Sequence, residues 1–123
     1  IASKHILIVD DARQARKAIR NQLRLLGFAH IEEASGGEEL FRSLQSQLPD
    51  LIILDIAMPG MNGYEVIGRL KGHTATAEIP VLILSGEDVD SRELRLKSPA
   101  TAIRTLPKPV GLDMLNAHVS YLL

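Results

Sequence analysis

Residues 51–63 read LIILDIAMPGMNG, an apolar run that ends at Asp55 and is followed by turn residues. Four consecutive apolar residues bounded by turn signals are typical of a strand buried on both faces of a parallel sheet. Ligand sites in open parallel sheets lie beyond the carboxyl ends of the strands, so Asp55 stands where a functional carboxylate would be placed. An isolated aspartate at such a position more often caps a turn, so its role depends on the other strands.

Four further segments have the length and character of strands, at residues 5–9, 30–34, 80–84 and 101–106. Apolar residues at helical spacing predict helices in the intervening segments, at residues 12–26, 35–48, 63–71, 88–97 and 112–122. The pattern is weakest in residues 88–97, where Leu94 and Leu96 do not share a helical face. Five strands alternating with five helices predict a single α/β domain, a (βα)5 parallel sheet with helices on both faces.

The apolar character of the strands also predicts their order in the sheet. The three most apolar strands begin at His5, Leu51 and Pro80, so we expect them at the centre, whereas the more polar strand at residues 30–34 belongs near an edge. This fits the doubly wound order 2-1-3-4-5, whose switch point lies between strands 1 and 3. Within the second helix, Ser35 and Glu38 have the spacing of a capping box, and Leu48 ends the expected buried stripe.

Composition excludes several classes of function. The net charge of the 123 residues is -1, which argues against non-specific binding of this domain to nucleic acid or membranes. The absence of cysteine excludes disulfides and thiolate metal sites, and it suits a cytoplasmic location. No apolar run is long enough to span a membrane. Because the chain begins without methionine and ends within an apolar helical pattern, we expect residues 1–123 to be one domain excised from a longer chain.

Polar side chains follow four of the five predicted strands at the point where each strand ends. Strand 1 is followed by Asp10 and Asp11, strand 3 by Asp55, strand 4 by Ser85 and strand 5 by Lys108. Each residue alone has an ordinary explanation, as a helix cap, a turn residue or a solvated lysine. The carboxyl ends of parallel strands share one rim of the sheet, so we expect all five side chains to converge there.

The chemistry of such a cluster follows from its charge. Three adjacent carboxylates repel one another, so at least one is hard to ionise unless a cation is present. Oxygen ligands without histidine or cysteine favour Mg²⁺. An aspartate can act as the nucleophile that forms an aspartyl-phosphate. The metal ion and Lys108 would offset the charge of the transferring phosphoryl group, and Ser85 could donate a hydrogen bond to one of its oxygens.

In combination, VDD at residues 9–11, LDIAMPGMNG at residues 54–63, LSG at residues 84–86 and the pair Lys108-Pro109 resemble the receiver domains of response regulators. The resemblance covers essentially the whole chain and implies a flavodoxin-like fold with the strand order given above. It also implies a domain of two-component or chemotaxis signalling, which is not a conventional enzyme but catalyses its own phosphoryl transfer and slow autodephosphorylation.

The resemblance assigns a role to each residue of the rim. Asp55 would accept a phosphoryl group from a phosphohistidine on a histidine kinase or a histidine phosphotransfer protein. Asp11, Asp55 and the backbone carbonyl of Ala57 would bind Mg²⁺ directly, and Asp10 would act through water. Ser85 would take the place of the family's threonine or serine, and Lys108 would contact the phosphoryl group. The output would pass to a fused domain or a homodimer.

Three departures from the family pattern bear on signalling. Thr105 occupies the position, three residues before the lysine, where family members usually carry an aromatic ring that turns inward on activation. Thr101-Ala102 replaces the usual Gly-Ala pair, and Pro107 precedes the lysine. These departures favour an alternative, a constitutive protein-interaction module with a degenerate switch. A free-standing phosphatase with Asp55 as nucleophile is a third reading, which no small-substrate motif supports.

The four histidines, His5, His30, His73 and His118, are scattered along the chain. They show none of the spacings typical of metal ligands, so we interpret them as structural or surface residues. The glycines form no GxGxxG motif after the first strand, which makes a dinucleotide site unexpected.

Overall fold

The computed structural model describes residues 3–86 and 103–123. Within these residues, β-strands and α-helices alternate along the chain up to the fourth strand. The predicted helix at residues 88–97 and the first two residues of the predicted fifth strand lie outside the described residues. The elements are β1 (His5–Val9), α1 (Arg13–Leu25), β2 (His30–Ala34), α2 (Gly37–Ser46), β3 (Leu51–Asp55), α3 (Gly63–Lys71), β4 (Val81–Ser85), β5 (Ile103–Pro107) and α5 (Leu112–Leu122).

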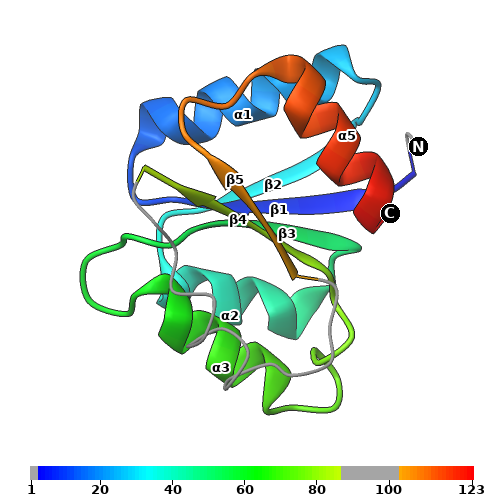
Figure 1. The fold of residues 1–123 in the computed structure, drawn as a ribbon. Helices are drawn as coiled ribbons and strands as arrows, with labels where there is room; N and C mark the ends of the chain where they lie inside the picture. Colours follow the sequence, from blue (N-terminus) through cyan, green and yellow to red (C-terminus); the bar gives the residue numbers. More distant parts are fainter. Residues whose placement is uncertain (1–2, 87–102) are drawn as a thin grey trace.

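The strands form one parallel sheet with the order β2-β1-β3-β4-β5, which confirms the predicted fold. All five residues are buried in each of β1, β3 and β4, the three strands predicted to be central. The more polar β2 lies at an edge, as predicted, and β5 lies at the other edge. Figure 1 shows α1 and α5 on one face of the sheet, and α2 and α3 on the other.

Two hydrophobic cores lie on the two faces of the sheet because successive residues of a strand point in opposite directions. On one side, Leu54 and other strand residues pack against Leu40 of α2 and Ile67 of α3. On the other side, Ile53 packs in a cluster with Leu23 of α1 and Leu115 of α5. Each central strand therefore buries both faces, which is why its sequence is a continuous apolar run. Among the described residues, no helix is long and apolar enough to cross a bilayer.

The predicted capping box of the second helix is wrong. Gly36 is the N-cap residue of α2 and makes no side-chain cap, while the hydroxyl of Ser35 donates to Glu39 Oε2 at 2.9 Å. The helix also ends at Ser46, so the expected buried Leu48 lies beyond the last turn and is 46% exposed. Helical spacing no longer sets the direction of a side chain once the helix has ended.

The loop between β3 and α3 depends on a close backbone approach at Gly63. The amide of Gly63 donates to the carbonyl of Ile56 at 2.9 Å, and a Cβ at position 63 would lie 2.7 Å from the Cα of Ile56. The next helix begins here, with the side chain of Asn62 accepting a hydrogen bond from the amide of Glu65. Because this loop directly follows Asp55, its packing positions the end of β3.

We expect Gly63→Ala to lower the free energy of unfolding by about 1–3 kcal/mol, because the new methyl group meets backbone atoms that cannot move independently. Gly86→Ala is the matched control, since a Cβ at that position meets nothing within 4 Å, and it should change stability by less than about 0.5 kcal/mol. Urea unfolding of both variants measures the difference. Equal stability of the two variants would show that the loop relaxes freely around position 63.

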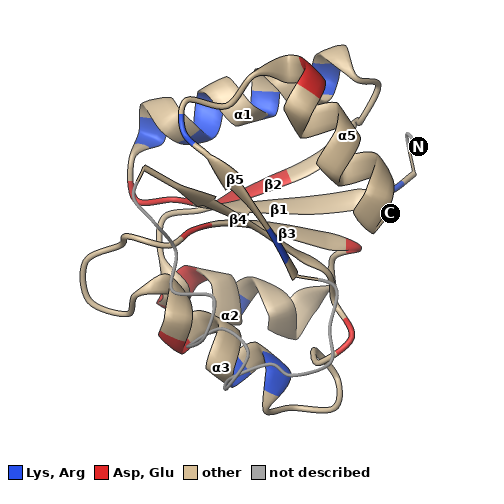
Figure 2. Cartoon of the chain, viewed as in Figure 1, with Lys and Arg blue, Asp and Glu red and all other residues tan. Residues whose placement is uncertain are grey.

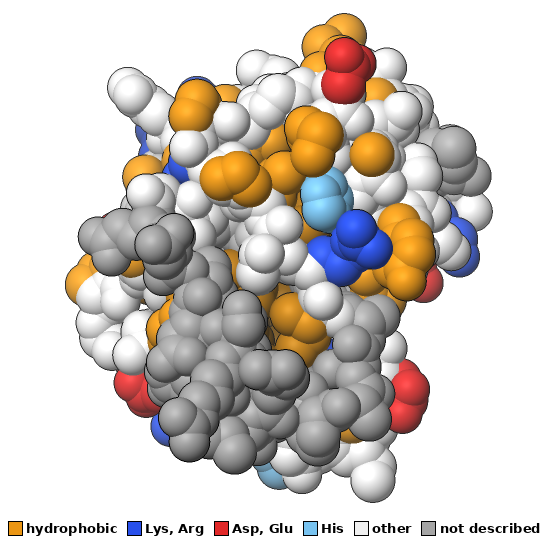
Figure 3. Space-filling model, viewed as in Figure 1, with side chains coloured by type: hydrophobic (Ala, Val, Ile, Leu, Met, Phe, Trp, Pro, Cys, Tyr) orange, Lys and Arg blue, Asp and Glu red, His pale blue; other side chains and the backbone are white. Residues whose placement is uncertain are grey.

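β5 and α5 together present a mixed surface of basic, histidine and apolar side chains. Arg104 Nε donates to His118 Nδ1 at 3.0 Å, and the guanidinium carbon lies 4.1 Å from the centre of the Tyr121 ring. Figure 3 shows a histidine, a basic side chain and apolar side chains next to one another on this face. Thr105, the residue at the usual aromatic position, is exposed on β5.

Candidate functional site

Three carboxylates meet at the carboxyl ends of β1 and β3. Asp10 and Asp55 are buried, with 3% and 6% of their surfaces exposed, whereas Asp11 is exposed. One carboxylate oxygen from each of the three lies within 4.8 Å of the others. Figure 2 shows these acidic segments at the left-hand ends of the two strands. The parallel sheet therefore brings together aspartates that are 45 positions apart in the sequence, because neighbouring strands end at the same rim.

Hydrogen bonds from neighbouring residues hold Asp10 and Asp55 in place. Asp10 Oδ1 accepts a hydrogen bond from the amide of Ala12 at 2.9 Å, at the start of α1. The carbonyl of Asp10 accepts a hydrogen bond from Arg16 Nη1 at 2.7 Å. Asp55 Oδ1 accepts a longer hydrogen bond of 3.4 Å from the amide of Ala57. Asp55 is thus less constrained by hydrogen bonds from the backbone than Asp10 is.

Lys108 supplies a positive charge between the two buried carboxylates. Its Nζ atom lies 3.4 Å from Asp10 Oδ2 and 3.4 Å from Asp55 Oδ1. The lysine reaches this position because its amide donates to the carbonyl of Ser85 at 2.8 Å, which continues the β4–β5 ladder beyond its last residue pair. Ser85 is itself buried and follows Leu84, the residue paired with Asp55. All five predicted rim residues therefore lie at the carboxyl ends of the strands.

The environment of Asp55 disfavours its charged form. Burial raises the pKa of the Asp55 carboxyl above its ordinary value of 3.8, and the negative charge of Asp10 raises this pKa further. The ammonium group of Lys108 and the hydrogen bond from Ala57 act in the opposite direction, without cancelling the rise in pKa. A cation bound among the acids would lower the pKa and favour the ionised carboxylate.

This raised pKa predicts that Asp55→Asn stabilises the fold at neutral pH. The folded state holds the Asp55 proton more tightly than the unfolded chain does, so wild-type stability falls as pH rises through the raised pKa. Asparagine removes this penalty, so we expect Asp55→Asn to unfold at a higher urea concentration than the wild type at about pH 7. The gain should shrink toward about pH 4, because the folded state takes up the Asp55 proton at a pH above the ordinary value of 3.8 and the penalty for the buried charge then disappears. Urea unfolding of the variant and the wild type at both pH values, in the presence of chelator, measures this gain in stability. A gain that does not depend on pH would contradict the electrostatic explanation.

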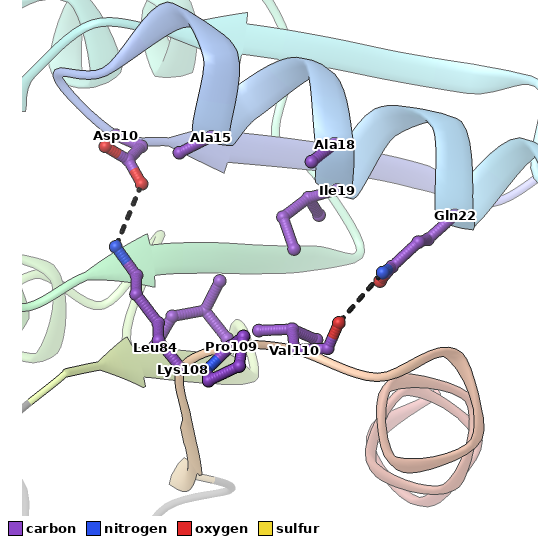
Figure 4. Close-up of a pocket in the computed structure, with 9 residues that line it drawn as sticks. All are labelled: Asp10, Ala15, Ala18, Ile19, Gln22, Leu84, Lys108, Pro109 and Val110. Carbon is purple, nitrogen blue, oxygen red and sulfur yellow. Dashed lines mark hydrogen bonds and ion pairs between the residues drawn. The ribbon is translucent and has the colours of Figure 1, made fainter.

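A cavity of about 480 Å³ adjoins the acidic rim between α1 and the segment that follows β5. Figure 4 shows Asp10 and Lys108 facing each other at one end, and Gln22 donating to the carbonyl of Val110 at the other, at 2.9 Å. Alanine and isoleucine side chains of α1 line the wall between them. No sequence pattern indicates this cavity, because it depends on how α1 packs beside a loop 88 positions away.

Comparison with known proteins identifies the family. The family model for the response regulator receiver domain matches residues 6–120. The chain is 36% identical over 122 residues to the response regulator MprA of Mycobacterium tuberculosis, an alignment that covers 98% of this chain and 51% of that protein. The chain therefore spans about half the length of the curated relatives it matches.

Solved structures give the same result. The chemotaxis protein CheY4 of Vibrio cholerae superposes with a TM-score of 0.85 at 26% identity, over 98% of each chain. The signal receiver domain of a signal transduction histidine kinase from Syntrophus aciditrophicus superposes with a TM-score of 0.83 at 32% identity, over 98% of this chain and 90% of that one. The chain belongs to the response regulator receiver domain family, whose members are signalling modules of two-component systems.

Proposed function

We propose that this domain accepts a phosphoryl group on Asp55 and that the added charge controls its interactions with a partner or an output domain. The observation that carries the proposal is the placement of Lys108 Nζ 3.4 Å from both Asp10 and Asp55, inside a cluster of three carboxylates. Such a site binds a cation and an anionic group together, as phosphoryl transfer requires.

The donor set fits Mg²⁺. The carboxylates of Asp10, Asp11 and Asp55 are hard oxygen ligands, and no other ligand type belongs to the cluster formed by the described residues. Asp11 and Asp55 would bind the ion directly together with the carbonyl of Ala57, and Asp10 would act through a water molecule. When bound, Mg²⁺ neutralises negative charge on the transferring phosphoryl group.

Asp55, Lys108 and Ser85 have different roles in the phosphoryl transfer. A carboxylate oxygen of Asp55 attacks the phosphorus atom of a phosphohistidine, a new P–O bond forms, and the P–N bond breaks to release the imidazole. No general base is needed, because the nucleophile is already an anion. Lys108 favours the ionised form of Asp55 before the transfer and pairs with a phosphoryl oxygen after it. The hydroxyl of Ser85 donates a hydrogen bond to another of these oxygens.

A histidine kinase or a histidine phosphotransfer protein is the partner that this chemistry requires, and a cytoplasmic location belongs to the same proposal. The output would be transmitted through a fused domain or a homodimer, and a fused domain fits the finding that this chain covers about half the length of its curated relatives. The phosphoryl group adds negative charge to a site that already contains several acids, and this shifts the equilibrium between conformations of the surrounding loops.

A constitutive interaction module is the second candidate, and the exposed Thr105 favours it. A threonine cannot bury the area of an aromatic ring, so an inward turn at this position would contribute little to a conformational change. In this case Asp55 would still accept the phosphoryl group, but phosphorylation would not change the affinity for the partner.

One experiment tests the proposal and separates the two candidates. The domain is incubated with Mg²⁺ and a small phosphodonor, and its intact mass, oligomeric state and affinity for the partner kinase are measured before and after. We expect one phosphoryl adduct and a change in oligomeric state or affinity. An adduct without either change would favour the constitutive module, and the absence of any adduct would contradict both candidates.

A further inference from the structure

A second group of metal-ligand side chains lies at the end of the sheet opposite Asp55. His5 begins β1 and His30 begins β2, and the parallel register pairs these two residues directly. Glu32 lies on the same face of β2 as His30, since alternate residues of a strand share a face. One ligand atom from each of the three residues lies within 4.8 Å of the others. Strand pairing therefore gathers two imidazoles and a carboxylate that show no metal-ligand spacing in the sequence.

His5 is the buried member of this group, with 3% of its surface exposed. Its amide donates to Asp50 Oδ2 at 2.7 Å, which fixes the start of β1. Nδ1 of the His5 ring has no hydrogen-bond partner among the described residues. A buried polar nitrogen without a partner is unfavourable, so a ligand that binds the ring would restore a missing interaction.

The other two side chains approach the same point. Nε2 of His5 lies 2.5 Å from Glu32 Oε1, a distance at which the two groups form an ion pair when the ring is protonated. The His30 ring stacks on His5, with ring centres 4.0 Å apart and planes inclined by 6°. His30 is exposed and the Glu32 side chain is 39% exposed, so solvent reaches the group and both side chains are free to adjust around the fixed His5 ring.

We propose that His5, His30 and Glu32 form a binding site for a divalent transition-metal ion of the Zn²⁺ type. Two imidazole nitrogens and one carboxylate oxygen are a ligand set that suits Zn²⁺, and a water molecule completes four-coordination. The all-oxygen cluster at the other rim suits Mg²⁺ instead. The two ends of β1 therefore select different cations, and the proposed zinc site does not depend on phosphorylation of Asp55.

Zinc binding is tested on the intact domain with ZnCl₂ as the probe and Mg²⁺ in excess, so that the acidic rim is occupied. Ring signals of the four histidines are followed by NMR. We expect the signals of His5 and His30 to shift together, to saturate at one Zn²⁺ per chain, and to return on addition of chelator. The signals of His73 and His118 should stay in place. If the His5 and His30 signals do not shift at saturating Zn²⁺, the proposal is wrong.

Variants of the exposed ligands make the test independent of folding defects at buried His5. His30→Gln and Glu32→Gln should each weaken Zn²⁺ binding by about 100-fold or more, since even supporting residues around metal ligands typically contribute 10- to 100-fold. His73→Gln removes an exposed histidine outside the group and should leave the affinity unchanged. Unchanged affinity in His30→Gln, or weak binding by the wild type itself, would show that His5 and Glu32 form only an ion pair. Phosphoryl labelling of Asp55 should be equal in all three variants.

Discussion

Asp55→Asn is expected to abolish formation of the phosphoryl adduct while leaving the fold intact. The amide oxygen of asparagine is a poor nucleophile, and the described site offers no other buried carboxylate beyond Asp10, which is held by Ala12 and Lys108. The remaining rate should be below about 1% of the wild-type rate, consistent with losses of several orders of magnitude when a nucleophile is removed. Intact mass spectrometry after incubation with Mg²⁺ and a small phosphodonor measures the adduct.

The matched control for this variant is Asp113→Asn, which changes an exposed aspartate in the first turn of α5. It alters the same chemical group and the same net charge, but it lies outside the acidic rim. We expect wild-type labelling. Equal labelling of Asp55→Asn and the wild type would place the acceptor elsewhere and would remove the basis of the proposed function.

Removal of Mg²⁺, or the substitution Asp11→Asn, is expected to slow phosphorylation by about 100-fold or more. Without the cation, the incoming phosphoryl group meets three carboxylates and only the single positive charge of Lys108. Asp11 is the exposed member of the cluster, so its substitution should weaken metal binding with little effect on folding. Residues that merely support a metal ligand already contribute 10- to 100-fold, so a direct ligand should contribute at least as much.

Labelling rates at increasing Mg²⁺ concentration distinguish the metal site from other causes. For Asp11→Asn we expect the half-saturating Mg²⁺ concentration to rise, with partial recovery of the rate at high concentration. Asp113→Asn again serves as the control and should behave as the wild type. Full labelling of the wild type in chelator would show that the cation has no part in the transfer.

The sheet and its acidic rim can be predicted from the sequence, because both follow from short-range patterns. A strand that is buried on both faces must be continuously apolar, and its first polar residue marks the point where it leaves the core. The apolar runs alone therefore locate Asp55 and Asp10 at strand ends, and the parallel direction of the strands brings Lys108 to the same rim.

Features that depend on register and packing cannot be predicted in this way. His5 and His30 are 25 positions apart, and only the exact pairing of β1 with β2 stacks their rings. The predicted cap of α2 is wrong because the hydroxyl of Ser35 donates to the side chain of Glu39 and does not cap the helix. The spacing of Ser35 and Glu38 in the sequence gives no sign of this contact. The contact of Arg16 with the carbonyl of Asp10 likewise depends on how α1 lies beside β1.

We propose that separate strands bring their charged groups to one site for Mg²⁺ and a phosphoryl group. A titration with Mg²⁺, followed through the backbone amide NMR signals, tests it most directly. We predict that the amides of Asp10, Asp11, Asp55 and Lys108 shift together and fit a single dissociation constant. Shifts confined to one of these segments, or separate constants for different segments, would contradict a shared site.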